Sequence, residues 1–171
     1  EFGWKTSLLD GRMIFNGAIF RSEYDDKQES ILIPVDLSNV ATVVRNASSL
    51  EMTGLELEVQ YQLTEAWDVM ATYGYLKSEY DDYLADLSGD GVITDNSDLV
   101  PRNTPENTFG LTTSYTARVG NGDLKARISY RFRDSMESES QNNPLGSLDS
   151  IHNVNANINY SINNYGISVW G

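Results

Sequence analysis

The sequence contains no cysteine and a single histidine, His152, and each scarcity excludes a class of site. Without cysteine there is no disulfide, no thiolate zinc site and no cysteine nucleophile. One histidine excludes a metal centre built from several histidines. Cations are also few: 12 Lys and Arg stand against 25 Asp and Glu, which gives a net charge of −13. A chain this acidic is not expected to bind nucleic acid, because the phosphate backbone repels it.

Long hydrophobic runs and catalytic motifs are missing as well. No apolar run approaches the roughly 18 residues of a membrane-spanning helix. No serine lies in a nucleophile motif, and the glycines fall in hairpins and strands rather than in a phosphate-binding loop. We therefore expect no enzyme, no catalytic residue and no organic cofactor.

The dominant pattern in the sequence has a period of two residues. Apolar and polar side chains alternate in residues 55–61, 109–115, 124–133 and 154–162. Because successive side chains of a strand point to opposite faces, each segment predicts a strand with one apolar and one polar face.

Turn signals separate these segments and alternate with longer polar links. Asp10-Gly11 and Gly120-Asn121-Gly122 are typical of tight hairpins, while residues 24–39, 78–106 and 136–149 read as long connections. The sequence therefore predicts an all-β chain of about eight strands, at residues 2–9, 12–24, 41–62, 67–80, 107–119, 124–135, 150–162 and 165–171.

The length of these strands favours a membrane barrel over a soluble sandwich. Sandwich strands average about five or six residues, whereas a tilted strand needs about ten to cross a bilayer. Short turns on one side and long loops on the other are typical of outer-membrane barrels. The polar face would then line a watered lumen, which holds charges at a lower desolvation cost than a packed interior. The lumen-lining candidates are Glu56, Glu58, Arg127, Arg131 and Arg133.

Four stretches resemble, in order, motifs of TonB-dependent outer-membrane receptors. They are residues 2–12 (FGWKTSLLDGR) with 16–20 (NGAIF), 46–58 (NASSLEMTGLELE), 101–109 (PRNTPENTF) and 168–171 (SVWG). Each motif is weak alone, but together they cover nearly the whole chain. The resemblance implies an antiparallel transmembrane β-barrel of roughly 22 strands, of which residues 1–171 would be a C-terminal portion lacking the plug and the last strand.

The same resemblance implies a function and a place in the cell. The family imports scarce nutrients of the siderophore, cobalamin or glycan type across the outer membrane of Gram-negative bacteria. The expected partners are a small-molecule nutrient, outer-membrane lipid and lipopolysaccharide, and the TonB complex, which would act through the plug. No residue of this chain is assigned to TonB.

One loop resembles a calcium site. In residues 86–98, oxygen ligands at positions 1, 3 and 5 would come from Asp86, Ser88 and Asp90, with the Val92 carbonyl at position 7 and Asp95 at position 10. Position 12, normally a bidentate acid, is a serine. The loop therefore reads either as a Ca²⁺ site or as a solvated acidic loop.

Two other classes remain open at the level of sequence. The first is a complete eight-strand outer-membrane protein with a structural or adhesive role. The second is a secreted β-sandwich that binds calcium or a glycan, which would be soluble without detergent.

Overall fold

A computed structural model describes residues 1–34 and 40–171, with the side chains of residues 30–34, 40, 45 and 47 also outside the description. The described chain is almost entirely strand. Its elements are β1 (Phe2–Leu8), β2 (Met13–Pro34), β3 (Val40–Thr64), β4 (Trp67–Ala85), β5 (Thr94–Asp95), β6 (Asn107–Val119), β7 (Gly122–Arg133), β8 (Met136–Glu137), β9 (Ser147–Leu148), β10 (Ile151–Ile162) and β11 (Tyr165–Trp170). Among the described residues, no helix has the length and apolarity needed to span a membrane.

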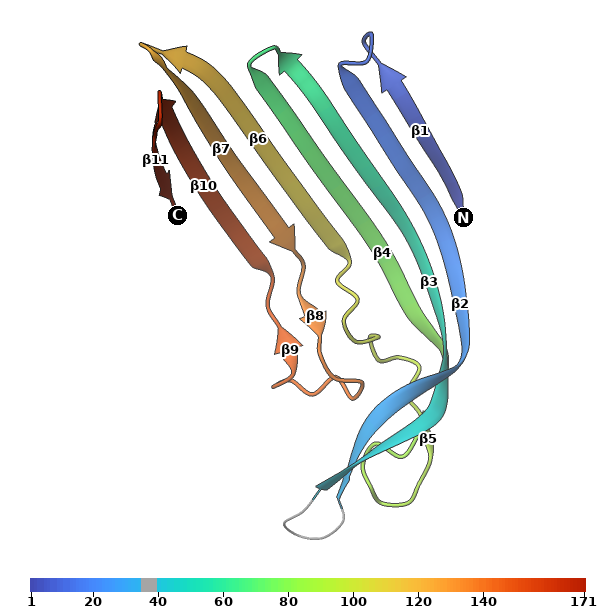
Figure 1. Ribbon diagram of the computed structural model, residues 1–171. Helices are drawn as coiled ribbons and strands as arrows, with labels where there is room; N and C mark the ends of the chain where they lie inside the picture. The colour runs from blue at the N-terminus through green and yellow to red at the C-terminus, as the bar shows by residue number, and fades with distance from the viewer. Residues whose placement is uncertain (35–39) are drawn as a thin grey trace.

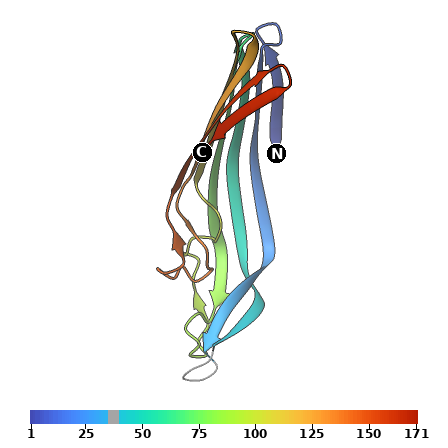
Figure 2. The same cartoon turned by 60° about the vertical axis from the view of Figure 1, so that its left-hand side comes forward.

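The main sheet is a meander of long antiparallel strands in the order β1-β2-β3-β4-β6-β7-β10-β11 (Figure 1). Figure 2 shows that these strands form a single curved layer. Within the described residues β1 pairs only with β2 and β11 only with β10, so the eight strands do not close on one another. The single layer excludes the two-layer sandwich, and the open order differs from the closed eight-strand barrel.

The two ends of the sheet are unlike. At one end, which we call the tight-turn end, two-residue turns join β3 to β4, β6 to β7 and β10 to β11. At the opposite, long-connection end lie residues 86–106 and 134–150, which carry the short pairs β4–β5 and β8–β9. This alternation confirms the arrangement predicted from the turn signals.

The strand predictions are confirmed for all eight long strands, with two corrections, of which the smaller is that residues 81–85, expected in a long connection, continue β4. Residues 24–34, expected in a long connection, continue β2 and pair with β3 through Val40. The remainder of that expected connection, residues 35–39, lies outside the described residues. The register shifts between Tyr24 and Lys27, where Asp26 takes a positive φ of 53°. The polar pair Asp25-Asp26 thus makes a bulge, which increases local twist without ending the strand. The β2–β3 ribbon therefore extends beyond the rest of the sheet (Figure 1).

One face of the sheet is apolar and exposed across all the long strands. Leu57 of β3 lies opposite Tyr73 of β4, and Leu111 of β6 lies opposite Tyr130 of β7, which in turn lies opposite Val154 of β10. Exposed apolar side chains continue along this face, including Ile128 at 53 % and Val154 at 65 %. An exposed apolar surface of this extent is costly in water and needs an apolar neighbour.

Candidate functional site

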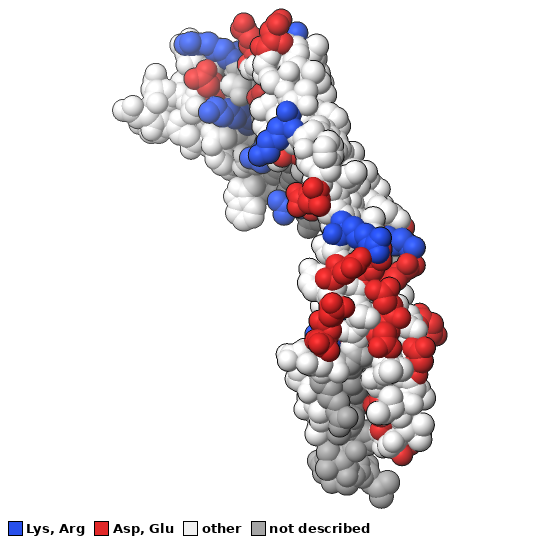
Figure 3. Space-filling model, turned by 90° about the vertical axis from the view of Figure 1, so that its right-hand side faces the viewer, with Lys and Arg blue, Asp and Glu red and all other residues white. Residues whose placement is uncertain are grey.

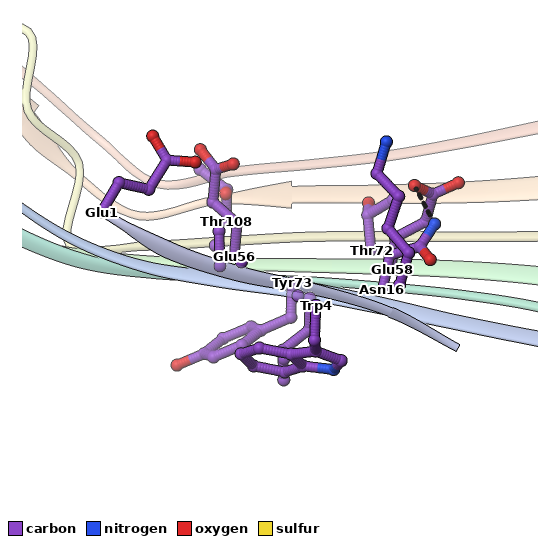
Figure 4. A pocket seen from close by; sticks show the side chains of 14 residues that line it. Glu1, Trp4, Asn16, Glu56, Glu58, Thr72, Tyr73 and Thr108 are labelled. Atoms are coloured by element: carbon purple, nitrogen blue, oxygen red, sulfur yellow. Dashed lines mark hydrogen bonds between the residues drawn. The ribbon is translucent and has the colours of Figure 1, made fainter.

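The opposite face of the sheet gathers the predicted lumen-lining residues. Glu56 and Glu58 alternate with Leu55 and Leu57 along β3, so they point away from the apolar face. Figure 4 shows the carboxylates of Glu56 and Glu58 on one side of the sheet and the rings of Trp4 and Tyr73 on the other. We call this second surface the polar face. It is hollowed over β1–β6 into a cavity of about 680 Å³ that both glutamates line.

A cross-strand row connects the acidic and the basic parts of the polar face. Glu58 of β3 is in register with Thr72 of β4, Thr72 with Gly110 of β6, and Gly110 with Arg131 of β7. The next strand, β10, adds Asn153 to the row. Strands lie about 4.8 Å apart, so three strand spacings separate Glu58 from Arg131 by roughly 14 Å. That distance exceeds the Debye length of about 8 Å at physiological salt, so the two charges are largely screened from each other.

Small residues form the floor between the two charged parts. Thr72 lies opposite Gly110, and Thr108 lies opposite Gly74. A Cβ added to Gly110 would come within 2.6 Å of the Thr72 hydroxyl oxygen, and one added to Gly74 within 2.7 Å of the Thr108 hydroxyl oxygen. The glycines therefore let the threonine side chains lie flat across the neighbouring strand. The floor stays low, and two hollows of the polar face reach it: the one over β1–β6 and another over β4, β6, β7 and β10.

The charges of the polar face have few partners within the described residues. Glu58 accepts hydrogen bonds from the side-chain amides of Gln60 (2.5 Å) and Asn16 (3.5 Å). Arg133 donates to the backbone carbonyl oxygen of Asp149 at 2.9 Å. None of the ion pairs between described residues includes one of the five predicted lumen-lining residues, so their charges are available to a molecule facing the sheet.

The predicted calcium loop has a compact geometry of its own. The Asp86 carboxylate accepts hydrogen bonds from the backbone N–H groups of Gly89 (2.7 Å) and Gly91 (2.8 Å) and from the Ser88 hydroxyl (3.2 Å). Partial burial raises the pKa of Asp86, but these hydrogen bonds outweigh it and the pKa is lowered overall.

The other predicted ligands of this loop make similar local contacts. Asp90 accepts from the N–H of Val92, and Asp95 accepts from both the N–H and the hydroxyl of Ser97. Within the part of the chain that the structure describes, no group of three or more His, Cys, Asp or Glu side chains is arranged to hold a metal ion. Calcium binding therefore stays a prediction, with the carboxylates of Asp86, Asp90 and Asp95 engaged in shaping the loop.

Sequence reasoning missed the most buried part of the molecule. At the long-connection end, Leu50, Tyr80, Tyr83 and Ala85 form a hydrophobic core against which Met52, Leu87 and Leu99 pack. Residues 86–106 are further attached by the Asn96 backbone N–H, which donates to the Tyr83 carbonyl oxygen at 2.8 Å. We call the two connections, residues 86–106 and 134–150, together with this core the loop cap.

A buried carboxylate, Glu29, lies at the centre of the loop cap and is 0 % exposed. Its Oε1 accepts hydrogen bonds from Tyr80 (3.0 Å) and from the ammonium group of Lys27, which also lies 5.3 Å from the centre of the Tyr80 ring. Its Oε2 accepts from the Ser140 hydroxyl at 2.5 Å and lies 3.4 Å from the Arg102 guanidinium. We call Glu29 with these four partners the Glu29 hub.

The hub keeps Glu29 ionised. Burial raises the pKa of its carboxyl group, but the hydrogen bonds from Lys27 and Ser140 and the Lys27 charge outweigh burial and lower the pKa overall. The same surroundings act oppositely on the tyrosines: burial and the Glu29 charge raise the pKa of Tyr83 to about 12 and that of Tyr80 still further. Both hydroxyls therefore stay neutral at physiological pH.

These pKa directions predict how the loop cap responds to acid. A carboxylate whose pKa is lower in the folded state contributes stability above its ordinary pKa of 4.5 and loses it as the pH falls through the folded value. We expect hydrogen exchange of residues 99–104, corrected for intrinsic rates, to be constant from pH 7 to about pH 5 and to rise below about pH 4. In the Glu29→Gln variant the step should vanish. A step centred near pH 6 would contradict the assignment.

The fold and the site together define a class of protein. A single antiparallel sheet of long strands, with one exposed apolar face and one polar face, is the wall of an outer-membrane-type β-barrel. The chain belongs to the TonB dependent receptor-like, beta-barrel family, whose model matches residues 1–171.

Named relatives agree with this family. The chain is 26 % identical over 140 residues to the catecholate siderophore receptor Fiu of Escherichia coli K12, a stretch that covers 82 % of this chain and 16 % of Fiu. Among solved structures it resembles the siderophore receptor PiuA of Acinetobacter baumannii (TM-score 0.73, 23 % identity, 98 % of this chain and 22 % of PiuA). It also resembles the ferric yersiniabactin uptake receptor FyuA of Yersinia pestis (TM-score 0.68, 16 % identity, 98 % of this chain and 23 % of FyuA). The chain thus spans less than a quarter of the length of these proteins.

Proposed function

We propose that this chain is part of the barrel wall of a TonB-energised outer-membrane receptor that imports a small nutrient of the ferric siderophore type. The observation that carries the proposal is an exposed apolar face backed by a polar face on which the five predicted lumen-lining residues make no ion pair with any described residue. The apolar face would contact lipid, and Glu56, Glu58, Arg127, Arg131 and Arg133 would line the lumen. The named relatives are receptors for siderophores, which supports this class of nutrient over cobalamin or glycans.

The apolar face has the dimensions of a membrane span. Along β4 its outward side chains are Trp67, Val69, Ala71, Tyr73 and Tyr75. This stretch is about nine residues long, which matches the nine to eleven residues of a transmembrane strand. Aromatic residues at both ends match the interfacial girdles of outer-membrane barrels. We therefore place the tight-turn end in the periplasm and the loop cap outside the cell.

Charged side chains begin where the apolar face ends. On the same side of the sheet, Arg21 of β2 lies in a row with Thr53 and Lys77, and the next row is Glu23, Glu51 and Glu79. Arg21 pairs with Glu51 (2.7 Å) and Glu23 (2.8 Å), and Lys77 pairs with Glu79 (2.8 Å). Figure 3 shows acidic side chains gathered toward the long-connection end, with Lys and Arg beside them. We propose that this charged belt lies at the headgroups, where lipopolysaccharide would be its neighbour.

The two edges of the sheet bear on how residues 1–171 fit into a complete barrel. Among the described residues, β1 and β11 each pair along one edge only, and such a sheet needs further strands to close a barrel. We propose that residues 1–171 form one arc of a larger barrel. The plug and the contact with the TonB complex would be supplied by other parts of the receptor.

Uptake of iron tests the proposed function. Cells producing the full-length receptor, and lacking their other siderophore receptors, are expected to accumulate ⁵⁵Fe supplied as a tris-catecholate complex. The accumulation should disappear in cells without TonB, because transport through such receptors is energised from the inner membrane. Accumulation from a tris-hydroxamate iron complex, measured in parallel, shows whether the receptor prefers catecholate or hydroxamate ligands of iron. Accumulation that is independent of both the receptor and TonB would refute the proposal.

A further inference from the structure

The loop cap lies over one end of the polar face. Leu50 is in register with Tyr80 and Ser48 with Tyr83, and Ser48 and Leu50 continue the even-numbered series that includes Glu56 and Glu58 along β3. The buried core is therefore on the same side of the sheet as the polar face. Since Leu99 packs on this core, residues 86–106 fold inward over that side rather than away from it.

The two connections behave as one body. The Val100 backbone N–H donates to the Asn142 side-chain oxygen (2.7 Å), and the Asn142 amide donates back to the Val100 carbonyl oxygen (2.8 Å). The Asn103 backbone N–H donates to the Glu137 carbonyl oxygen at 2.7 Å. These contacts bind residues 99–103 to residues 137–142 independently of the strands.

The charged side chain of Glu29 attaches the two connections to the long strands. Its carboxylate binds Ser140 from one connection and Arg102 from the other, while Lys27 and Tyr80 come from β2 and β4. Ser140 is separated from Glu29 by 111 residues of sequence. A single carboxylate thus joins its own strand, β2, to β4 and to both connections.

A buried carboxylate is a demanding way to join segments. An apolar residue at this position would stabilise the contact to a similar extent. A buried charge, by contrast, is tolerated only when all of its partners are in place. Loss of one partner leaves the buried carboxylate less fully compensated, so the contacts of the hub support one another. Without the carboxylate, the hub would also retain two cationic groups, those of Lys27 and Arg102, with no anion between them.

We propose that Glu29 is a positioning residue that latches the two connections, as one body, over the external end of the polar face. In the closed arrangement the latch fixes the surface that a ligand meets first. Opening it frees both connections together. The statement about ligand access rests on the proposed function, whereas the latch itself does not.

Trypsin cleavage after Arg102, measured by mass spectrometry on the full-length receptor in outer-membrane vesicles, tests the latch. The peptide bond between Arg102 and Asn103 is protected in the closed arrangement, because Arg102 lies in the hub and the Asn103 N–H donates a hydrogen bond to the Glu137 carbonyl oxygen. We expect Glu29→Gln and Ser140→Ala each to raise the cleavage rate about tenfold, since cleavage follows the population of the open form. The matched control is Glu23→Gln, which removes a carboxylate of the same strand that is 63 % exposed.

The double variant separates a latch from general loosening. Because both side chains act through one contact, Glu29→Gln with Ser140→Ala should cleave no faster than Glu29→Gln alone. Hydrogen exchange should rise in residues 99–104 and 138–146 and stay unchanged in β6 and β7. Ser140 lies outside the strands of the sheet, so its variant does not depend on barrel assembly. Cleavage at the Glu23→Gln rate, or effects that multiply in the double variant, would overturn the proposal. Failed iron uptake with the latch behaving as expected would refute the proposed function alone.

Discussion

Replacing Leu57 with arginine is expected to destabilise the membrane-inserted receptor by about 2–4 kcal/mol, the cost of a cation near the midplane on the lipid face of a barrel. Leu57 lies on the apolar face between Gly17 of β2 and Tyr73 of β4. The arginine would have to leave its charge in hydrocarbon or bend toward the headgroups. Equilibrium unfolding of the full-length receptor in lipid vesicles measures the effect.

The matched control places the same cation on the opposite face. Thr72 precedes Tyr73 in β4, points to the polar face and lines two of its hollows. Thr72→Arg should change the free energy of unfolding by less than about 1 kcal/mol, because an arginine in a watered lumen keeps its hydration. If Leu57→Arg and Thr72→Arg lowered the free energy of unfolding equally, the apolar face and the polar face would not meet different solvents.

Truncating Leu50 to alanine is expected to loosen the loop cap by about 2–5 kcal/mol, the usual cost of removing a buried leucine side chain. Leu50 is 2 % exposed and lies at the centre of the only apolar core in the part of the chain that the structure describes. Native-state hydrogen exchange at the Asn96 and Asn103 amides reports the opening free energy, because both are bonded within the cap.

Leu84→Ala is the control for this second prediction. Leu84 lies in β4 between two core residues, Tyr83 and Ala85, but is itself 51 % exposed. Its truncation should change the opening free energy by no more than about 0.5 kcal/mol. If Leu50→Ala changed exchange along β6 and β7 as much as in the cap, the cap would not be an independent unit of the structure.

The membrane-spanning part of the fold is readable from the sequence because lipid enforces a strict alternation. Every second residue of β7, from Leu124 to Phe132, must be apolar where the other face is wet. Two-residue turns fix the ends of such strands equally clearly. The polar-face residues follow from the same parity, which puts Glu56 and Arg131 on one face of the sheet, while their place in a lumen stays a prediction.

The loop cap could not be predicted in the same way. Residues 25–29 are all polar or charged and show no apolar alternation, and the bulge at Asp26 reads as a turn. Glu29 looks like any solvated acid, because nothing local distinguishes it. Its burial depends on Ser140 and Arg102, which only the folded chain brings to it.

If the two faces of this sheet meet lipid and water, the solvent accessibility of successive residues along β7 must alternate. Residues 1–171 contain no cysteine, so a spin label can be attached at single cysteines introduced at positions 127–132, with any cysteine elsewhere in the full-length receptor replaced, and measured in lipid vesicles. We expect labels at Ile128, Tyr130 and Phe132 to be relaxed mainly by oxygen, and labels at Arg127, Ser129 and Arg131 mainly by a water-soluble nickel chelate. Equal exposure of all six positions to the nickel chelate would contradict this expectation.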